Sequence, residues 1–540
     1  MKIFYTAAVL VLVLVASVKG QAPEWEWARG AAGNGAGYGI STDAHGNSYV
    51  AGDGEIVTSS NDTLTNGNAF IAKYDELGNV LWAKSGTGTF SGWGTVAIDA
   101  YDNVYSAGSY ASDTVTFGNY VLTGGCIYIV KYDSSGNVIW ANNIAGDPYN
   151  RTSGISADAM GNIYITGTYK SLIIGNDTLI FAGSQSLFLV KYGATGNFSW
   201  VKTFGEMYDD EINGVTTDNK ENVYVTGSFT DSALIFGNDT LMNINLDSAY
   251  EFYLVKYDSA GNVIWAKSAG GSSGCEGAGV SVDTTGNIYI TGGFTGPNIV
   301  FGSTSLFSMN NPTIFILKYD TAGKVLWGET AGGGEIDETS GITTDIDGNV
   351  YIKGDFAGGY IYFGGILLHT PSFENVFVAK YNSLGSPLWA KTVSANGDDI
   401  VGYINGISTD AKDNVYVTGF GWEPVVFDSD SLGIQSNNPN YDFYFTAKLV
   451  NDSITALPTL SPPAHLITVY PNPTTGMVYF SGAPSGCTLQ VYNVLGEVIS
   501  SSIIDRDNYS INLTGKAKGI YFYRITGADN GVQQGKVVVE

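Results

Sequence analysis

Residues 279–294 read GVSVDTTGNIYITGGF, and residues 312–331 read PTIFILKYDTAGKVLWGETA. Apolar and polar residues alternate in four short runs, which is the pattern of half-buried β-strands. We name these strands a to d: strand a ends at Asp283, and strands b, c and d begin at Asn287, Phe315 and Lys324. Gly-Asn or a similar pair separates a from b and c from d, and such residues tolerate the positive φ of hairpin turns. The stretch therefore predicts one four-stranded antiparallel unit.

The same unit recurs along the whole chain. The asparagine that opens strand b recurs at Asn47, Asn103, Asn162, Asn222, Asn287, Asn349 and Asn414. The lysine of strand c recurs at Lys73, Lys131, Lys191, Lys256, Lys318, Lys380 and Lys448. The first lysine spacing is 58 residues (131 − 73) and the last is 68 (448 − 380). A unit of this length suits one blade of a β-propeller with a variable insertion.

The tryptophan of strand d is offset by one repeat from the asparagine and lysine anchors. It follows only six of the lysines, as Trp82, Trp140, Trp200, Trp265, Trp327 and Trp389. Nothing like it follows Lys448, but Trp27-Ala28-Arg29 matches Trp82-Ala83-Lys84. An N-terminal strand at Glu24–Arg29 that pairs with Phe443–Leu449 would complete the last blade and leave no open sheet edge. The offset predicts an all-β fold, with a closed seven-bladed β-propeller over residues 21–452.

Two further segments flank the predicted propeller. Lys2 precedes the apolar run from Ala7 to Val18, and the small Gly20 fits cleavage before Gln21, so residues 1–20 predict a secretory signal peptide. The run is short of the ~20 residues of a membrane span, and we expect no transmembrane segment. At the other end, prolines mark a linker at residues 453–465. Residues 466–540 then alternate as strands do and predict a small antiparallel β-sandwich.

Composition excludes several classes of function. The net charge of −26 should repel nucleic acid and anionic membranes, and the propeller region holds only two arginines, Arg29 and Arg151. The chain has three histidines and three scattered cysteines. No catalytic triad, zinc site or disulfide framework can be assembled from these residues. We therefore expect no enzyme activity and no resident cofactor.

The repeat resembles the family of bacterial β-propeller repeat proteins, whose units read roughly W-A-K, then D, G-N-x-Y-V-T-G and K-Y-D. The resemblance covers about residues 25–450. It implies the fold but not the function, because propellers host many unrelated activities. The Asp-x-x-Gly-Asn turns differ in spacing from sialidase Asp boxes, and we interpret them as structural. Tryptophans and Lys-Tyr pairs that recur in every blade are expected to pack blade against blade.

The C-terminal module resembles the type A C-terminal sorting domain of type IX secretion cargo. The matching residues are Tyr470, Pro471, Asn472, Pro473, Gly476, Gly496, Gly519, Tyr521, Gly535 and Lys536. The resemblance implies that the secretion machinery recognises this domain and exports the chain across the outer membrane of a Bacteroidota-type bacterium. In that family the domain is often cleaved after export, and some cargo is attached to surface lipopolysaccharide. The chain is therefore expected in the medium or on the outer cell surface.

Candidate ligand residues gather on one face of the predicted ring. The d–a connections and the b–c segments share a face, which we call the connection face; the a–b and c–d turns form the opposite turn face. The b–c segments look long and irregular, and several d–a connections are acidic, a combination typical of binding loops on a rigid scaffold. The candidate residues are Trp93, Tyr149, Tyr208, Asp209, Asp210, Glu211, Glu276, Glu335, Asp337, Glu338, Asp398 and Asp399. No loop has the spacing of a known metal site, but calcium is the ion expected if one binds.

Three functions remain open at this point. The first is a non-catalytic extracellular binding or adhesion protein with a glycan or protein ligand. The second is a polysaccharide hydrolase or lyase that uses paired carboxylates of the acidic loops. The third is a structural protein of the cell surface.

Overall fold

The structure is a computed structural model. It describes residues 23–540 except 32–34, 58–62, 91–93, 176, 182, 184, 206–208, 244–248, 272–273, 309–311, 336, 370–373, 396–402, 422–424, 428–429, 433–442, 451–467, 482–485, 494–497, 507–508 and 527–531. These residues form β-strands and no helix. The chain separates into a larger unit within residues 22–452 and a smaller one within residues 453–540.

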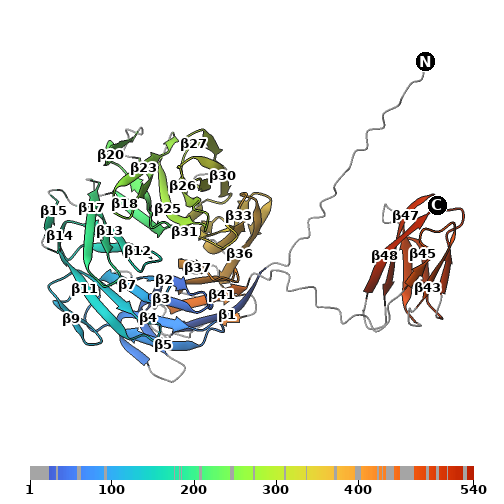
Figure 1. The fold of residues 1–540 in the computed structure, drawn as a ribbon, viewed down its shortest axis with the longest axis horizontal. Helices are drawn as coiled ribbons and strands as arrows, with labels where there is room; N and C mark the ends of the chain where they lie inside the picture. The colour runs from blue at the N-terminus through green and yellow to red at the C-terminus, as the bar shows by residue number, and fades with distance from the viewer. Residues whose placement is uncertain are drawn as a thin grey trace, which may run out of the picture. The chain divides into compact units, whose positions relative to one another are not determined.

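Seven four-stranded antiparallel sheets make up the larger unit, and we number them blades 1 to 7. The strands of blades 1 to 4, in the order a to d, are β2 (Ala36–Thr42), β3 (Ser48–Val57), β4 (Thr63–Tyr74) and β5 (Val80–Ser85); β6 (Thr95–Ile98), β7 (Val104–Ser109), β10 (Ile127–Tyr132) and β11 (Val138–Gly146); β12 (Arg151–Ala157), β13 (Ile163–Tyr169), β16 (Ser186–Tyr192) and β17 (Phe198–Phe204); and β18 (Glu211–Thr217), β19 (Val223–Phe229), β22 (Glu251–Tyr257) and β23 (Val263–Ser268). Those of blades 5 to 7 are β25 (Cys275–Val282), β26 (Ile288–Phe294), β29 (Thr313–Tyr319) and β30 (Val325–Gly332); β31 (Asp337–Thr344), β32 (Val350–Ala357), β35 (Glu374–Tyr381) and β36 (Pro387–Ala395); and β37 (Tyr403–Thr409), β38 (Val415–Gly421), β41 (Phe443–Val450) and β1 (Glu24–Ala31). Figure 1 shows these blades arranged in a ring, so the propeller prediction is confirmed.

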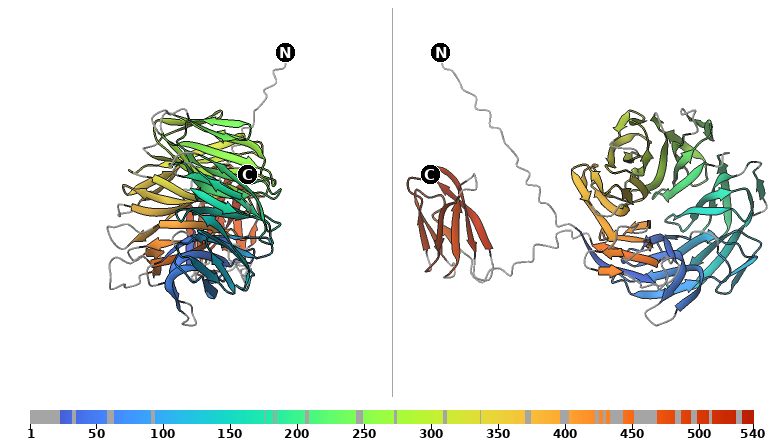
Figure 2. Two further views of the ribbon diagram at one scale, coloured as in Figure 1. Left: turned by 90° about the vertical axis from the view of Figure 1, so that its left-hand side faces the viewer. Right: turned by 180° about the vertical axis from the view of Figure 1, so that it is seen from behind.

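The ring closes through its two chain ends. The N-terminal strand β1 pairs antiparallel with β41, and Trp27 lies opposite Lys448, as Trp82 lies opposite Lys73 in blade 1. Trp27 is 4% exposed and its indole N–H donates to the carbonyl of Glu76 in blade 1 at 3.0 Å. The predicted closing strand is therefore confirmed, and blade 7 contains both the first and the last strand of the ring (Figure 2).

The expectation that the b–c segments are irregular is wrong. Most of them fold into a second hairpin: β8–β9 (Thr114–Phe117, Tyr120–Thr123), β14–β15 (Ser171–Ile174, Asp177–Ile180), β20–β21 (Ala233–Phe236, Asp239–Met242), β27–β28 (Asn298–Phe301, Thr304–Phe307), β33–β34 (Tyr360–Phe363, Ile366–His369) and β39–β40 (Val425–Phe427, Asp430–Leu432). Glycines with positive φ, such as Gly237 (59°) and Gly364 (58°), make the two-residue turns. Apolar side chains such as Leu234 and Ile361 are buried, and they anchor each hairpin to the core.

Several of these hairpins extend the outer strand of the preceding blade. In β14, Ile173 pairs with Ala145 of β11, and in β33, Phe363 pairs with Ala331 of β30. The short strand β24 (Gly270–Gly271) pairs with β27 in the same way, and β39 pairs with β36. Each such repeat therefore contributes backbone hydrogen bonds to its neighbour as well as to its own sheet.

The core lies between neighbouring blades. One cluster joins Tyr224 and Leu254 of blade 4 to Ile290 and Leu317 of blade 5, all fully buried. Strands b and c are buried along nearly their whole length because both faces of each blade meet another blade.

The smaller unit contains two antiparallel sheets, as expected for a sandwich. The first holds β42 (Thr468–Tyr470), β43 (Met477–Ser481) and β46 (Tyr509–Asn512). The second holds β45 (Val498–Ile503), β44 (Thr488–Tyr492), β47 (Gly519–Thr526) and β48 (Val532–Val539). Val478, Leu489 and Val537 contribute to a shared core, so this unit has its own apolar interior.

Candidate functional site

On the turn face, each recurring aspartate holds its own a–b turn. In blade 5, Asp283 Oδ1 accepts hydrogen bonds from the N–H groups of Thr285 and Asn287, both at 2.9 Å. Its Oδ2 accepts from the Asn287 amide at 2.8 Å and from the Tyr289 hydroxyl at 3.1 Å. The equivalent aspartates are Asp43, Asp99, Asp158, Asp218, Asp345 and Asp410. The carboxylates are fully engaged, which fits the structural interpretation of these turns.

The c–d turns lock each blade to the one before it. Lys318 Nζ and Trp327 Nε1 of blade 5 both donate to the carbonyl of Ser383 in blade 6, each at 3.1 Å. A Cβ on Gly385 of that turn would lie 2.9 Å from the Trp327 ring, so only glycine fits there. The recurring tryptophans and lysines therefore pack blade against blade, as their recurrence predicts.

On the connection face, the blades differ from one another at the start of strand a. One register position, which we call the entry position, holds Arg151, Glu211, Glu276 and Glu338 in blades 3 to 6. Strands a are the innermost strands; for example, Gly214 of β18 faces Val280 of β25 across the blade boundary. The entry position therefore brings three carboxylates of consecutive blades to the inner edge of the ring.

The three entry glutamates influence one another electrostatically. Burial raises the pKa of Glu276 to about 7, and the negative charges of Glu211 and Glu338 add to the shift. Asn213 connects blades 4 and 5 here, because its Nδ2 donates to Glu211 Oε2 at 3.2 Å and to the Gly277 carbonyl at 3.1 Å. The Glu276 carboxyl therefore keeps its proton to a higher pH than an exposed glutamate does.

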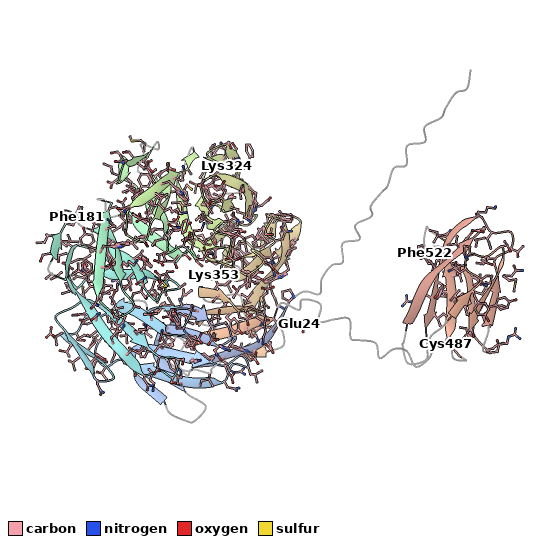
Figure 3. All side chains as sticks on the ribbon, viewed as in Figure 1. Glu24, Phe181, Lys324, Lys353, Cys487 and Phe522 are labelled. Atoms are coloured by element: carbon pink, nitrogen blue, oxygen red, sulfur yellow. The ribbon has the colours of Figure 1, made fainter. Side chains whose placement is uncertain are left out.

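Lys353 of blade 6 also departs from the repeat. Its register position in strand b holds small residues in the other blades, namely Ala51, Ala107, Thr166, Thr226, Thr291 and Thr418. Lys353 is 1% exposed, and its Nζ donates to the carbonyl and the hydroxyl of Ser340 in strand a, at 2.9 and 2.8 Å. Burial lowers its pKa to about 7, although Asp355 acts in the opposite direction. Figure 3 shows Lys353 toward the centre of the ring.

The predicted ligand residues divide into three groups. Exposed residues of the connection face are Tyr149, Asp209, Glu211, Glu335 and Glu338, and Glu276 is half-buried. Asp210 and Asp337 are 1% and 0% exposed, so we remove them from the candidate ligand set. Trp93, Tyr208, Asp398 and Asp399 lie outside the described residues.

Asp210 and Asp337 instead hold the connections in place. Asp210 Oδ1 accepts from the N–H of Thr230 at 2.9 Å, at the end of strand b, and Asp337 Oδ2 accepts from the N–H of Gly333 at 2.8 Å. Asn150 does the same in blade 3, because its Oδ1 accepts from the N–H of Lys170 at 3.0 Å. Each of these three residues directly precedes an entry residue. When the repeats are aligned on the entry position, a recurring Asp or Asn before it is the sequence signal for this structural role.

A cavity lies at the outer edge of the ring, between blades 3 and 4. Its volume is about 350 Å³, and it is lined by the end of β17, the β20–β21 hairpin and the following c–d turn. Lys202, Ile235 and Asn262 contribute to the lining. No sequence motif predicts this cavity, because its shape depends on how the β20–β21 hairpin packs against the neighbouring blade.

Within the described part of the chain, one group brings metal-type ligand atoms together: Asp43, His45 and Asp102 lie within 4.8 Å of one another. The Asp43 carboxylate already accepts hydrogen bonds from Asn47 and Tyr49. That leaves one histidine and one carboxylate, which is too few for a protein metal site. We assign no metal to it.

In the C-terminal unit, the sorting motif ties its first loop to its last strand. Asn472 Nδ2 donates to the Lys536 carbonyl at 2.8 Å, and Asn472 Oδ1 accepts from the Val538 N–H at 2.9 Å. The peptide bonds that precede Pro471 and Pro473 are cis. Tyr521 is buried, and its hydroxyl donates to the Ala517 carbonyl at 2.9 Å. Gly496 lies outside the described residues.

Comparison with known proteins identifies this unit. Residues 468–540 match the family model of the secretion system C-terminal sorting domain. The uncharacterized WD repeat-containing protein L264 of Acanthamoeba polyphaga mimivirus is 24% identical over 468 residues, covering 69% of this chain. The present chain spans only 33% of that relative's length.

Solved structures of low identity resemble the chain as well. PorZ, a surface component of the type IX secretion system of Porphyromonas gingivalis, is 10% identical with a TM-score of 0.21, covering 93% of this chain and 81% of its own. The polysaccharide lyase Uly1 is 11% identical with a TM-score of 0.39, covering 81% and 94%. The gluconolactonase XC5397 of Xanthomonas campestris is 9% identical with a TM-score of 0.32, covering 78% and 99%. At these identities and scores the likenesses assign no activity to this chain.

None of the described residues belongs to a helix long and apolar enough to cross a membrane. The match over residues 468–540 and the ordered motifs agree on the C-terminal unit. The chain thus consists of a β-propeller and, over residues 468–540, a domain that matches the secretion system C-terminal sorting domain.

Proposed function

We propose that the chain is a non-catalytic extracellular binding protein that takes a glycan or protein ligand on the connection face of its propeller. The entry position carries this proposal. There, the otherwise repetitive ring places Arg151, Glu211, Glu276 and Glu338 in neighbouring blades. Carboxylates accept hydrogen bonds from sugar hydroxyls and from peptide N–H groups, which suits either ligand.

The turn face differs from the connection face in a way that supports the proposal. Its aspartates, tyrosines, lysines and tryptophans are engaged in hydrogen bonds within and between blades, so they offer little to a ligand. Loops on a rigid scaffold commonly carry binding residues, and in this ring the variation lies on the connection face. Export as type IX cargo places such a surface outside the cell, either attached to it or released.

The test is a binding screen with the full mature chain against a panel of polysaccharides and surface proteins. The triple variant Glu211→Gln, Glu276→Gln, Glu338→Gln should lose at least tenfold in affinity for any ligand found. The control triple variant Asp102→Asn, Glu76→Gln, Glu221→Gln makes the same charge change on the turn face and should bind normally. Loss of binding in the control alone would place the site on the turn face and refute the proposal.

A polysaccharide hydrolase or lyase is the second candidate, and Glu276 favours it. A carboxyl group with a pKa of about 7 can donate a proton at neutral pH, as a general acid must. The same panel should be scored for new reducing ends and for unsaturated products. Turnover by the wild-type chain that Glu276→Gln abolishes would establish catalysis in place of simple binding. Neither binding nor turnover on the panel would favour a structural surface protein.

A further inference from the structure

The hairpin β33–β34 of blade 6 presents a different surface from the other hairpins of the ring. It forms the outermost part of the sheet β25-β26-β29-β30-β33-β34 and lies at the outer edge of the ring (Figure 1). Tyr360 pairs with His369 and Tyr362 with Leu367, and cross-strand partners share one face of a sheet. The other face of β33 is buried. These four side chains therefore lie together on the outside of the propeller, and we call them the rim patch.

Aromatic rings distinguish the rim patch from the equivalent hairpins. The positions of Tyr360 and Tyr362 hold smaller or aliphatic residues in blades 2 to 5, namely Thr114 and Thr116, Ser171 and Ile173, Ala233 and Ile235, and Asn298 and Val300. Tyr360 and Tyr362 are 38% and 37% exposed, and Leu367 is 50% exposed. Among the ring pairs that the structure describes in the propeller, this is the one in which both rings are exposed. A single exposed apolar residue is ordinary, but a contiguous exposed group is typical of a binding surface.

The two tyrosine rings form a corner on bare backbone. Their centroids are 5.8 Å apart, and their planes meet at 75°. A Cβ on Gly333 would lie 3.0 Å from both rings, so the rings rest directly on the main chain at that residue. Asp337 Oδ2 accepts from the Gly333 N–H at 2.8 Å and holds this main chain in place. The corner is therefore built by the d–a connection as well as by the hairpin.

Polar groups lie beside the corner. His369 is opposite Tyr360 in the hairpin and is exposed. A Cβ on Gly358 would lie 3.3 Å from Glu335 Cγ, so the exposed Glu335 lies beside the loop that leads into Tyr360. Imidazole, carboxylate and phenol groups all form hydrogen bonds with hydroxyl groups. The hairpin has no lysine or arginine and the chain has a net charge of −26, so the charge of the patch suits an uncharged polar ligand and opposes an anion.

We infer that the rim patch is a second binding site of the propeller, which takes a pyranose residue of a neutral glycan. A pyranose ring has an apolar face of C–H groups and hydroxyl groups around its edge. One tyrosine ring stacks on the apolar face, while the other tyrosine, His369 and Glu335 bind the hydroxyl groups. Because the two rings are nearly perpendicular, a flat array of sugars cannot stack on both. The site therefore takes a sugar residue of a soluble chain and not the surface of an insoluble polysaccharide.

Soluble neutral oligosaccharides test the inference, with β-1,4-linked hexasaccharides of glucose, xylose and mannose as probes. Titration calorimetry uses the full mature chain that carries Glu211→Gln, Glu276→Gln and Glu338→Gln, so that the proposed site on the connection face does not contribute. At least one probe should bind with a Kd of about 1 mM or lower, and adding Tyr360→Ala and Tyr362→Ala should weaken that binding by about tenfold or more.

Three outcomes would overturn the inference. They are no binding of any probe, binding that the two tyrosine substitutions leave unchanged, and binding by the wild-type chain that only the three glutamate substitutions remove. The last outcome would support the proposed site on the connection face, so the two proposals can fail separately.

Two control variants separate the corner from its surroundings. Tyr149→Ala removes a tyrosine that is 78% exposed elsewhere on the ring, and it should leave the affinity unchanged. Gly333→Ala keeps both tyrosines but places a Cβ 3.0 Å from their rings, so it should weaken binding by about threefold or more. The tyrosine variants should melt within about 2 °C of the wild-type chain, because both side chains are exposed. An affinity that Gly333→Ala leaves unchanged, or equally tight binding of insoluble cellulose, would refute the corner as the site.

Discussion

The two faces of the propeller are built from the same repeats but use them in opposite ways. On the turn face, Asp283, Tyr289 and Trp327 recur in nearly every blade, and their polar atoms bind other parts of the ring. On the connection face, equivalent positions hold Arg151 in one blade and Glu276 in another. In this protein recurrence therefore marks residues that hold the ring together, whereas the residues that differ from blade to blade gather at the entry position of the connection face.

The contrast between the two faces is tested most strongly by removing one of the tryptophans that pack between neighbouring blades. Trp327→Ala should destabilise the propeller by about 3–5 kcal/mol, the range for truncating a large aromatic residue in a core. The variant loses the contact with Gly385 and the hydrogen bond to Ser383. Tyr149→Ala on the connection face is the control, because that side chain is 78% exposed, and it should change stability by less than about 0.5 kcal/mol. Urea unfolding followed by tryptophan fluorescence measures both, and similar losses would contradict the contrast.

Removing a turn aspartate should have the next largest effect. Asp283→Ala leaves the Tyr289 hydroxyl and the Asn287 amide without their acceptor, at a cost of about 2–4 kcal/mol. Although burial alone would raise the pKa of Asp283, hydrogen bonds from Asn287 and Thr285 bring it below its ordinary value. The wild-type chain therefore loses stability as pH falls through this lowered pKa, and the variant should show a smaller loss between pH 5 and pH 2. An unchanged acid profile would show that the carboxylate is not the group responsible.

Glu276 should behave in the opposite way, because burial raises its pKa to about 7. The folded state favours the protonated form of Glu276. The wild-type chain therefore carries no penalty from this group at pH 4, and its free energy of unfolding falls as pH rises from the ordinary glutamate pKa to about 7. Glu276→Gln should therefore stabilise the propeller by about 1–2 kcal/mol at pH 8 and by almost nothing at pH 4. Thermal unfolding at the two pH values measures this, with Glu335→Gln as an exposed control from the same face. A pH-independent difference would contradict the assignment.

Lys353→Thr restores the residue that four of the other six blades carry, and we expect its effect on stability to be the smallest of the four substitutions and to depend on pH. Burial lowers the pKa of Lys353 to about 7. As pH falls from about 10 to 7, the lysine of the unfolded chain takes up a proton but that of the folded chain does not, so the free energy of unfolding falls. The variant should consequently gain stability relative to wild type between pH 9 and pH 6, by about 1 kcal/mol or more. If Lys353→Thr instead destabilises the chain at every pH, the lysine is a structural residue that replaces threonine.

Much of the fold could be predicted from the sequence, because repetition supplies many copies of the same evidence. The strand order, the closing strand and the roles of Trp327 and Asp283 all followed from anchors that occur in nearly every blade. The b–c hairpins could not be predicted in this way. Their strands are only three or four residues long, and what fixes them is pairing with the neighbouring blade, as between Ile173 and Ala145.

The candidate site was predicted less well, for a related reason. Acidic residues next to each other in the d–a connections look equivalent in sequence, but Asp210 is buried against Thr230 while the adjacent Glu211 is exposed at the entry position. A shift of one residue decides between the two roles, because alternate side chains of a strand face opposite sides. Lys353 was missed because it lies inside a strand, away from the loops in which ligand residues were sought.

The hairpins that extend the preceding blade bear on how such a protein can change its length during evolution. A repeat that pairs β14 with β11, or β33 with β30, carries half of each interface and receives the other half from the next repeat. A duplicated copy of a repeat with such a hairpin would therefore bring a strand that can pair with the outer strand of the blade before it. The ring's size is then set by the geometry of closure at β1 and β41, and gene duplication can alter the blades one at a time without redesigning their contacts.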